Sequence, residues 1–507
     1  MPELKPWQRP RQLWRQLPKP SAVKLPRVSG KLKTWQLTAG AATVGLAISA
    51  GAVAAAGPWD SSGQRTAERD WAASREAGGG ADHGGRTPGR PPSAPSVLAG
   101  LGAPAGTAPV PTGRALADVL DPIMKDPALG PEKAAVVVDA ASGKRVYGKD
   151  ADKLLTPAST IKIATAVAAL GSVGPDHRIT TKTVIETDAP GTPEVVLVGG
   201  GDPTLTARKD GRYTDTAANL RTLAEDTARA LKARDVDEVT LSYDTSLYSG
   251  PVPHPISPNE NITPVSPLMV DEGRLDDSSS GPAPRTEDPA GDAVRKFEGF
   301  LKDHGIKTKG QPGPSKASGR AESLAKTESP PLSFLVERML THSDNDIAEH
   351  LARQTALAAK EPASFDGAGA ATRAALDKLE LPVGDAVFAD GSGLDRADRA
   401  SALLLTELLD RAADPARPEL RSVLTGLPIA GFTGTLVDRY PKDSPGTGLV
   451  RAKTGTLTGV NTLSGTVVDA DGRLLVFAFM TTGTTDAKAA QKALDSMAST
   501  VANCGCR

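Results

Sequence analysis

The stretch PASTIK, residues 157–162, begins an apolar segment that keeps the spacing of an α-helix up to residue 170. If Ser159 lies at the start of that helix, Lys162 follows three residues later on the same face, within reach of the serine hydroxyl. A serine hydroxyl is a weak nucleophile until a base takes its proton, and a lysine can do so only if burial or a second cation destabilises its ammonium. Ser159 is therefore a candidate nucleophile and Lys162 its candidate base.

Two later stretches make this pairing specific, because Ser-x-x-Lys alone occurs in many helices that have no catalytic role. Ser343 and Asn345 belong to an SDN sequence between two helical segments, where a short loop can point a hydroxyl and an amide into a cleft. The sequence KTGT, residues 453–456, follows a strand-like segment and supplies a cation, hydroxyls and a glycine that allows a ligand close to the backbone. The three motifs, in this order, resemble the set of penicillin-binding proteins and class A β-lactamases.

The resemblance is closest to the low-molecular-mass penicillin-binding proteins of the D-alanyl-D-alanine carboxypeptidase/endopeptidase family that carry a domain inserted after the active-site helix. The long separation of Lys162 from Ser343 leaves room for such an insertion. The match extends over about residues 114–507. Without the family, the triple glycine at 199–201 reads as a turn after a strand, since it lacks the Gly-Lys-Ser/Thr ending of a phosphate loop. Further stretches that look like those of the family are GGGDPTL at 199–205, TPVSPL at 263–268, DEGR at 271–274 and DGSGL at 390–394.

The resemblance implies an α+β fold of the penicillin-binding/β-lactamase-like transpeptidase type. Such a fold has an antiparallel sheet flanked by helices, an all-helical subdomain and, in this group, an inserted domain, of which we expect one smaller copy here. The residue pattern agrees, because hairpins are predicted at 134–147 and 465–480 and a helix at 486–501. The expected domains are a serine peptidase domain at 113–174 and 321–507 and an inserted accessory domain at 175–320.

The resemblance also implies a role for each motif residue. Lys162 would take the proton as Ser159 attacks the carbonyl of the penultimate D-alanine, and Ser343 would relay a proton to the departing D-alanine. Asn345 would hold the substrate amide and Lys162. The implied catalytic residues are Ser159, Lys162, Ser343, Asn345 and Lys453, and the implied substrate-binding residues are Thr454, Gly455 and Thr456.

The terminal carboxylate of the substrate would be bound by Lys453 together with Thr454 and Thr456. Backbone N–H groups of Ser159 and Thr456 would form the oxyanion hole. Lys453 is also the second cation that could help to keep Lys162 neutral. No cofactor and no metal ion is implied.

The composition sets few limits on the partner. The 59 basic and 60 acidic residues nearly cancel, so no global field favours nucleic acid. The implied substrates are peptidoglycan stem peptides ending in D-Ala-D-Ala, and β-lactams would mimic them and leave a slow acyl-enzyme. Carboxypeptidase and cross-link endopeptidase activity stay undecided, because both cleave a D-Ala-D-Xaa bond at the same centre. The only cysteines, Cys504 and Cys506, provide no disulfide framework for the folded body.

The first 112 residues differ in composition from the rest of the chain. Nine Lys or Arg residues lie between Lys5 and Lys33, and an uncharged run of small apolar residues follows. These features predict a basic cytoplasmic segment, 1–34, and a single-pass membrane anchor, 35–57, with the catalytic part outside the cytoplasm. The alternative is a cleaved signal and a secreted protein, since the run contains small-residue cleavage sites. Residues 58–112, rich in Gly, Pro, Ala and Ser, predict a flexible linker.

Three other functions stay open at this point. A β-lactamase shares the motifs, and Glu380 lies where class A enzymes place a deacylating glutamate, although the asparagine expected nearby is missing. A non-hydrolytic penicillin-binding wall sensor would be acylated without turnover. A Ser-His-Asp hydrolase would need a histidine partner, but none of the six histidines has a nucleophile-elbow context.

Overall fold

The computed structural model describes residues 108–186, 191–209, 217–256 and 259–506, all of which belong to one compact unit of the chain. The predicted cytoplasmic segment and membrane anchor, 1–57, and most of the predicted linker lie outside the described residues. Within the described ranges, no helix is long and apolar enough to cross a membrane.

The first of two sheets is antiparallel and has five strands in the order β2-β1-β11-β10-β9. Strand β1, near the start of the described chain, pairs with β11 near its end, with Val137 opposite Phe477. Both predicted hairpins are confirmed, as β1–β2 and β10–β11. The strands are β1 (Glu132–Asp139), β2 (Lys144–Lys149), β9 (Arg451–Leu457), β10 (Val460–Val468) and β11 (Leu474–Thr482).

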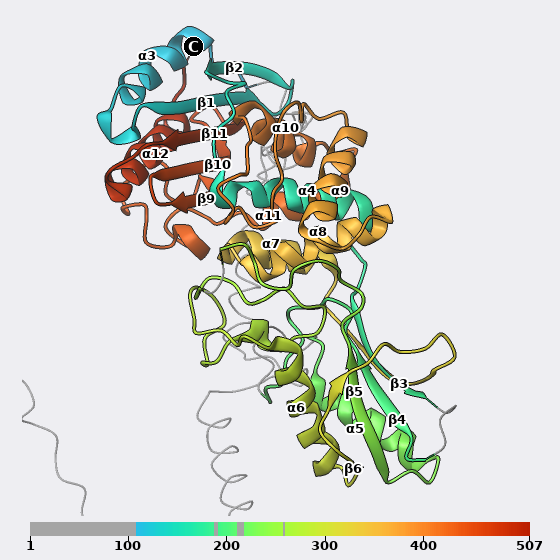
Figure 1. The fold of residues 1–507 in the computed structure, drawn as a ribbon. Helices are drawn as coiled ribbons and strands as arrows, with labels where there is room; N and C mark the ends of the chain where they lie inside the picture. The colour runs from blue at the N-terminus through green and yellow to red at the C-terminus, as the bar shows by residue number, and fades with distance from the viewer. Residues whose placement is uncertain (1–107, 187–190, 210–216, 257–258, 507) are drawn as a thin grey trace, which may run out of the picture. The chain divides into compact units, whose positions relative to one another are not determined.

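Helices cover both faces of this sheet (Figure 1). One face packs against α3 (Gly113–Met124) and α12 (Ala487–Ala502), the helix predicted at 486–501. The other face packs against α10 (Ala402–Ala413). Successive residues of a strand point to opposite faces, so Val136 belongs to the second of these cores and Val137 to the first. Both faces of the sheet are therefore buried.

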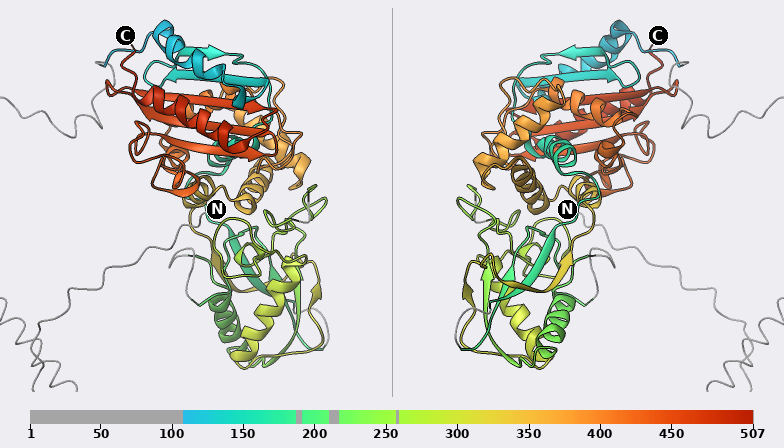
Figure 2. Two further views of the ribbon diagram at one scale, coloured as in Figure 1. Left: turned by 90° about the vertical axis from the view of Figure 1, so that its left-hand side faces the viewer. Right: turned by 90° about the vertical axis from the view of Figure 1, so that its right-hand side faces the viewer.

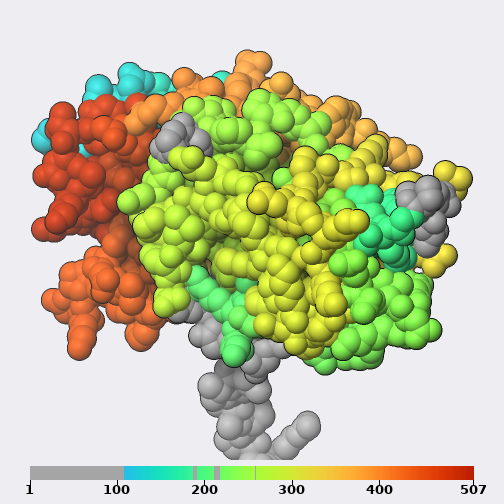
Figure 3. Space-filling model, turned by 60° about the horizontal axis from the view of Figure 1, so that its bottom comes forward, coloured from blue at the N-terminus to red at the C-terminus, as the bar shows by residue number. Residues whose placement is uncertain are grey.

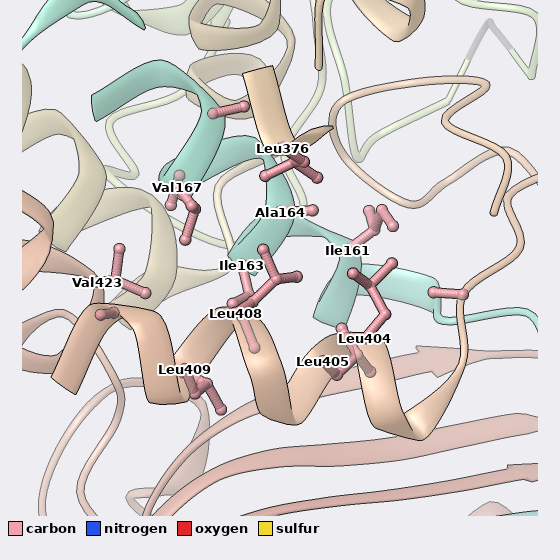
Figure 4. Packing of buried hydrophobic residues seen from close by; sticks show 14 of the residues in the cluster. Ile161, Ile163, Ala164, Val167, Leu376, Leu404, Leu405, Leu408, Leu409 and Val423 are labelled. Carbon is pink, nitrogen blue, oxygen red and sulfur yellow. The ribbon is translucent and has the colours of Figure 1, made fainter. Parts of the chain in front are cut away.

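The helix that begins at Lys162, α4 (Lys162–Val173), is buried on all sides, as a helix with little polar surface must be. Figure 4 shows Ile163 of α4 beside Leu408 of α10, and Leu376 of α9 on another side. This packing fixes the start of α4, where the PASTIK stretch lies. The neighbouring helices are α7 (Leu332–His342), α8 (Asn345–Ala359), α9 (Phe365–Lys378) and α11 (Arg421–Thr425).

Between α4 and α7 the chain forms a second sheet of mixed direction, in the order β6-β5-β4-β3-β8, with β7 paired to β5. The helices α5 (Leu220–Lys232) and α6 (Pro289–Asp303) pack on it around Leu223 and Phe297. Figure 2 shows this part beyond α7 and α8, and in Figure 3 its green and yellow residues cover much of the visible face. The strands are β3 (Thr180–Glu186), β4 (Glu194–Val198), β5 (Glu238–Asp244), β6 (Lys307–Thr308), β7 (Gly313–Pro314) and β8 (Glu322–Glu328).

The α+β class and the antiparallel sheet flanked by helices are thus as predicted, and so is one smaller insertion. The insertion has its own core, separate from the two cores of the first sheet. The boundary expected at residue 320 falls just before β8, a strand that pairs with β3 in the second sheet.

The triple glycine after β4 allows the insertion to approach the rest of the protein closely. Gly201 adopts a φ of +91°, and a Cβ atom on it would lie 2.8 Å from Gln354 Nε2 of α8. The Gly200 carbonyl accepts a hydrogen bond from Gln354 Nε2 of α8 at 3.0 Å. These glycines are therefore required for close packing.

Candidate active site

Ser159 lies in a 3₁₀ turn (Ala158–Ile161) that leads into α4, and Lys162 is the first residue of α4. The spacing of three residues places the two side chains together, as predicted. Lys162 Nζ donates to Ser159 Oγ at 3.1 Å. The lysine is fully buried, whereas Ser159 lines a cleft. Ala158, just before the serine, has a left-handed φ of +48°, so the turn is held in a conformation that costs an L-residue energy.

The SDN sequence forms the junction between α7 and α8. Ser343 ends α7 in the left-handed conformation, with a φ of 58° and a ψ of 39°. Asp344 caps α8, because its Oδ1 accepts from the Ile347 N–H at 2.9 Å. Asn345 is the first residue of α8, and its Oδ1 accepts from Lys162 Nζ at 2.7 Å. The junction therefore turns Ser343 and Asn345 toward the lysine–serine pair.

The KTGT sequence lies on β9, at the edge of the first sheet. Lys453 is fully buried, and its Nζ donates to Ser343 Oγ at 2.9 Å and to the Thr454 carbonyl at 2.7 Å. The hydroxyls of Thr454 and Thr435 lie 2.8 Å apart, and Thr456 Oγ1 accepts from Gln491 Nε2 at 3.3 Å. The structure thus joins Lys453 to Ser343, next to the group formed by Lys162, Ser159 and Asn345.

The Cβ side of Gly455 faces the turn that carries Ser159, and the expected close approach of a ligand to its backbone stays a prediction. A Cβ atom on Gly455 would lie 2.1 Å from Thr462 Oγ1 and 2.7 Å from the Pro157 carbonyl oxygen. Thr462 Oγ1 itself donates to the Pro157 carbonyl at 2.8 Å. Glycine is needed here because β9 passes directly beside the turn that carries Ser159.

Burial lowers the pKa of Lys162 to about 8, because the charged form loses its hydration. The carboxylates of Asp390, Asp344, Glu349 and Asp398 act in the opposite direction and favour the ammonium. The pKa of Lys453 is lowered well below its usual range, first by burial and then by the charges of Lys162 and Arg439. Burial is thus the main cause for Lys162. At Lys453, repulsion by the charge of Lys162 adds to the effect of burial.

A third partner of Lys162 was not predicted from the sequence. Lys162 Nζ donates to the backbone carbonyl of Ser392 at 2.5 Å, and Ser159 Oγ lies 3.4 Å from the same oxygen. Ser392 belongs to the DGSGL stretch that was quoted for its resemblance alone. Its contribution comes from the main chain, so side-chain chemistry gave no sign of it. The feature of the sequence that could have indicated this contact is the turn of small residues after Asp390.

The side chains surround a cleft of about 470 Å³. Ser159, Ser343, Asn345, Thr454 and Thr456 line it, whereas the two lysines are buried behind them. A larger cavity, of about 910 Å³, lies beside α12 and contains none of the predicted site residues. We therefore take the smaller cleft as the candidate active site.

The alternative partners considered from the sequence lie elsewhere. His342, at the end of α7, lines the cleft, but among the described residues no histidine is hydrogen-bonded to Ser159. Glu380 follows α9 and is not one of the residues that line the cleft. Cys504 and Cys506 form a disulfide with each other near the end of the chain.

An antiparallel sheet flanked by helices, with a serine and a buried lysine at the start of its central helix, defines the class of penicillin-recognising serine enzymes. The model of the D-Ala-D-Ala carboxypeptidase 3 (S13) family matches residues 116–280 and 275–504. The chain belongs to that family.

Curated relatives agree with this assignment. A carboxypeptidase of Mycobacterium tuberculosis is 36% identical over 438 residues, which cover 84% of this chain and 92% of that protein. The carboxypeptidase DacB of Mycolicibacterium smegmatis is 35% identical over 408 residues, covering 79% of this chain and 86% of that protein. The crystal structure of penicillin binding protein 4 (dacB) from Haemophilus influenzae has a TM-score of 0.61 at 21% identity, covers 75% of this chain and 98% of that chain, and shows the same fold. The expected serine D-Ala-D-Ala carboxypeptidase is thereby confirmed.

Proposed function

We propose that Ser159 is the nucleophile and Lys162 the general base of this carboxypeptidase, and that the substrates are peptidoglycan stem peptides ending in D-Ala-D-Ala. One observation carries the proposal: a buried lysine with a pKa lowered to about 8 lies 3.1 Å from the hydroxyl of a serine that faces the cleft. In its neutral form this lysine can accept the serine proton. A curated relative from Actinomadura, 30% identical over 71% of this chain, is itself a D-alanyl-D-alanine carboxypeptidase.

Acylation would proceed by attack of Ser159 Oγ on the carbonyl of the penultimate D-alanine. Lys162 Nζ takes the hydroxyl proton as the new C–O bond forms. The C–N bond then breaks, and the leaving nitrogen receives a proton through Ser343, whose hydroxyl is bonded to Lys453 Nζ. The products are an acyl-enzyme on Ser159 and free D-alanine.

Substrate binding would use the edge of β9. The hydroxyls of Thr454 and Thr456 line the cleft and can donate to the terminal carboxylate, and Lys453, buried behind them, would supply positive charge. The backbone N–H groups of Ser159 and Thr456 would bind the oxyanion, on the order of 3 kcal/mol for each donor. Asn345 would bind the substrate amide while its oxygen holds Lys162.

Hydrolysis of the acyl-enzyme by water would complete the turnover. β-Lactams would acylate Ser159 in the same way, but their acyl-enzyme would be hydrolysed slowly. A penicillin-binding relative has been solved in complex with a β-lactam. The proposed reaction does not involve nucleic acid.

The location proposed for the enzyme is the outer side of the cell membrane. Residues 35–57 would anchor the chain, with 1–34 in the cytoplasm and 58–112 as a linker that lets the enzyme reach the wall. We propose the peptidase domain at 113–174 and from about 330 onward, with the second sheet and its helices as the accessory domain between them. Recovery of the full-length chain in the membrane fraction, and its release when residues 1–57 are removed, would support the anchor. A chain cut after residue 57 and found in the medium would support the secreted form.

A fluorescent penicillin and a peptide ending in D-Ala-D-Ala test the proposed chemistry together. The wild-type protein should be labelled covalently and should release D-alanine, and Ser159→Ala should do neither. Persistent labelling of Ser159→Ala would refute the assignment of the nucleophile. Labelling of the wild type without D-alanine release would indicate a sensor, and rapid hydrolysis of the penicillin would indicate a β-lactamase.

A further inference from the structure

The connection between β5 and α6 in the insertion contacts the elements that carry the catalytic groups. Residues 254–256 and 259–285 of this connection, here called the bridging segment, reach α8 and the turn at 390–395. The motifs assign no role to these contacts. Three of them lead to Lys162 by separate routes.

The first contact fixes the side-chain amide of Asn345. Its Nδ2 donates to the Asn261 carbonyl at 2.9 Å, while its Oδ1 accepts from Lys162 Nζ at 2.7 Å. An amide has one accepting end and one donating end, so the Asn261 carbonyl determines which end faces the lysine. With the amide reversed, an NH₂ group would face Nζ and this hydrogen bond would be lost.

The second contact holds the first turn of α8. Asp346 Oδ1 accepts from the Thr263 N–H at 3.0 Å, and Oδ2 accepts from Arg285 Nη1 at 2.8 Å. The Arg285 side chain is 5% exposed and the Asp346 side chain 1%. A buried ion pair of this kind resists separation, because each partner alone would be an uncompensated charge. The pair therefore holds Asn345, the preceding residue, against the insertion.

The third contact reaches the other side of the lysine. His254 Nδ1 accepts from the Ile256 N–H at 3.3 Å, so in the neutral ring Nε2 carries the proton and donates to Asp390 Oδ2 at 3.0 Å. Asp390 Oδ1 accepts from the N–H groups of Ser392 and Gly393 at 2.9 and 2.5 Å. That turn presents the Ser392 carbonyl to Lys162 Nζ. His254 is thus connected to Lys162 through the Asp390 carboxylate and the turn that contains Ser392.

We propose that the bridging segment positions the general base, with His254 and Arg285 as positioning residues that hold the Ser392 carbonyl and Asn345 on Lys162. The inference rests on the proposed roles of Ser159 and Lys162. When the contact made by His254 or the contact made by Arg285 is lost, Lys162 Nζ moves away from Ser159 Oγ, and acylation slows. His254 is fully buried and does not line the cleft, so its loss changes kcat and leaves KM in place.

Variants of the full chain test this role. His254→Ala removes the donor to Asp390, His254→Gln supplies another N–H donor there, and His304→Ala, at the end of α6, is the matched control. We expect His254→Ala to slow both penicillin acylation and kcat for a D-Ala-D-Ala peptide, on the order of 10-fold to 100-fold, with KM unchanged within about twofold. His254→Gln should recover most of the rate, and His304→Ala should react as the wild type does.

The pH profile gives a readout that a purely structural role would not change. A displaced Lys162 meets more water, so the rise of the acylation rate with pH should move to higher pH in His254→Ala. A folded His254→Ala with the wild-type rate and profile would overturn the proposal. If His254→Ala does not fold, the double variant Arg285→Met/Asp346→Leu removes the second contact without leaving a lone buried charge. Wild-type kcat in that double variant would equally overturn the proposal.

The two proposals fail in different ways. Labelling that persists in Ser159→Ala contradicts the nucleophile assignment, whatever the His254 variants do. Variants that are labelled at Ser159 at undiminished rates contradict only the positioning role of the bridging segment.

Discussion

Lys453 Nζ donates to Ser343 Oγ at 2.9 Å from a fully buried position, so this cation acts on the cleft through a hydroxyl that lines it. Replacing Lys453 with Ala should therefore disorder Ser343 and weaken the binding of a terminal carboxylate. We expect acylation by penicillin to slow on the order of 100-fold. Stopped-flow labelling measures this rate, and Lys149→Ala, on the exposed end of β2, is the control. Unchanged acylation in Lys453→Ala would contradict the proposed part of Lys453.

The rate of acylation should rise with pH between 6 and 9. The pKa of Lys162 is lowered from 10.5 to about 8, and only the neutral lysine can take the proton of Ser159. At pH 6 about 1% of the lysines would be neutral, and at pH 9 about 90%. Measuring the rate constant of acylation across this range checks the direction. A flat or falling profile would show that another group is the base.

Gly455→Ala should damage both the fold and the reaction. The added methyl group would collide with Thr462 Oγ1 and the Pro157 carbonyl, which forces β9 away from the turn that carries Ser159. We expect a loss of about 1 to 3 kcal/mol in the free energy of unfolding, together with slower acylation.

A glycine without such neighbours provides the control for Gly455→Ala. Gly299 lies in α6, and a Cβ atom there would meet no atom within 4 Å. Gly299→Ala should stabilise the protein by about 0.5 to 1 kcal/mol, because alanine favours the helix. Equal melting temperatures for the two variants would contradict the close approach seen at Gly455.

A chain that begins at residue 105 should acylate penicillin at the rate of the full-length chain. It retains α3, whose Leu116 and Leu120 are fully buried against the first sheet. A chain that begins at residue 122 lacks these two leucines, and their burial is worth about 3 to 6 kcal/mol in total. Thermal unfolding of both proteins tests the difference. Equal stability would show that α3 does not belong to the folded core.

The sequence indicated which side chains lie together because the motifs carry recognisable chemistry in a fixed order. The spacing of Ser159 and Lys162 placed both at the start of one helix, and the SDN and KTGT stretches added their partners. Fold class followed from the same motifs together with the alternating residues of the two hairpins. The structure adds the distances that join the motifs.

Contacts made by the main chain could not be predicted in this way. The carbonyls of Ser392 and Asn261 take part in the site through their backbone oxygens, which every residue has. The neighbours on the Cβ side of Gly455, Thr462 and Pro157, could not be predicted either, because the tertiary fold brings them there. The sequence offered both burial and a second cation as causes of a lowered pKa at Lys162, and only the complete core shows that burial is the main one.

The pairing of β1 with β11 has a consequence for the newly made chain. The nucleophile is synthesised roughly three hundred residues before the strands that complete its surroundings, β9 to β11. Contacts so distant in sequence form late and slowly in folding. A ribosome-bound chain that ends before residue 451 carries Ser159 and Lys162 without the edge strand that would bind a substrate carboxylate. Until β9 has been made, the nascent chain therefore lacks the strand that carries Lys453, Thr454 and Thr456.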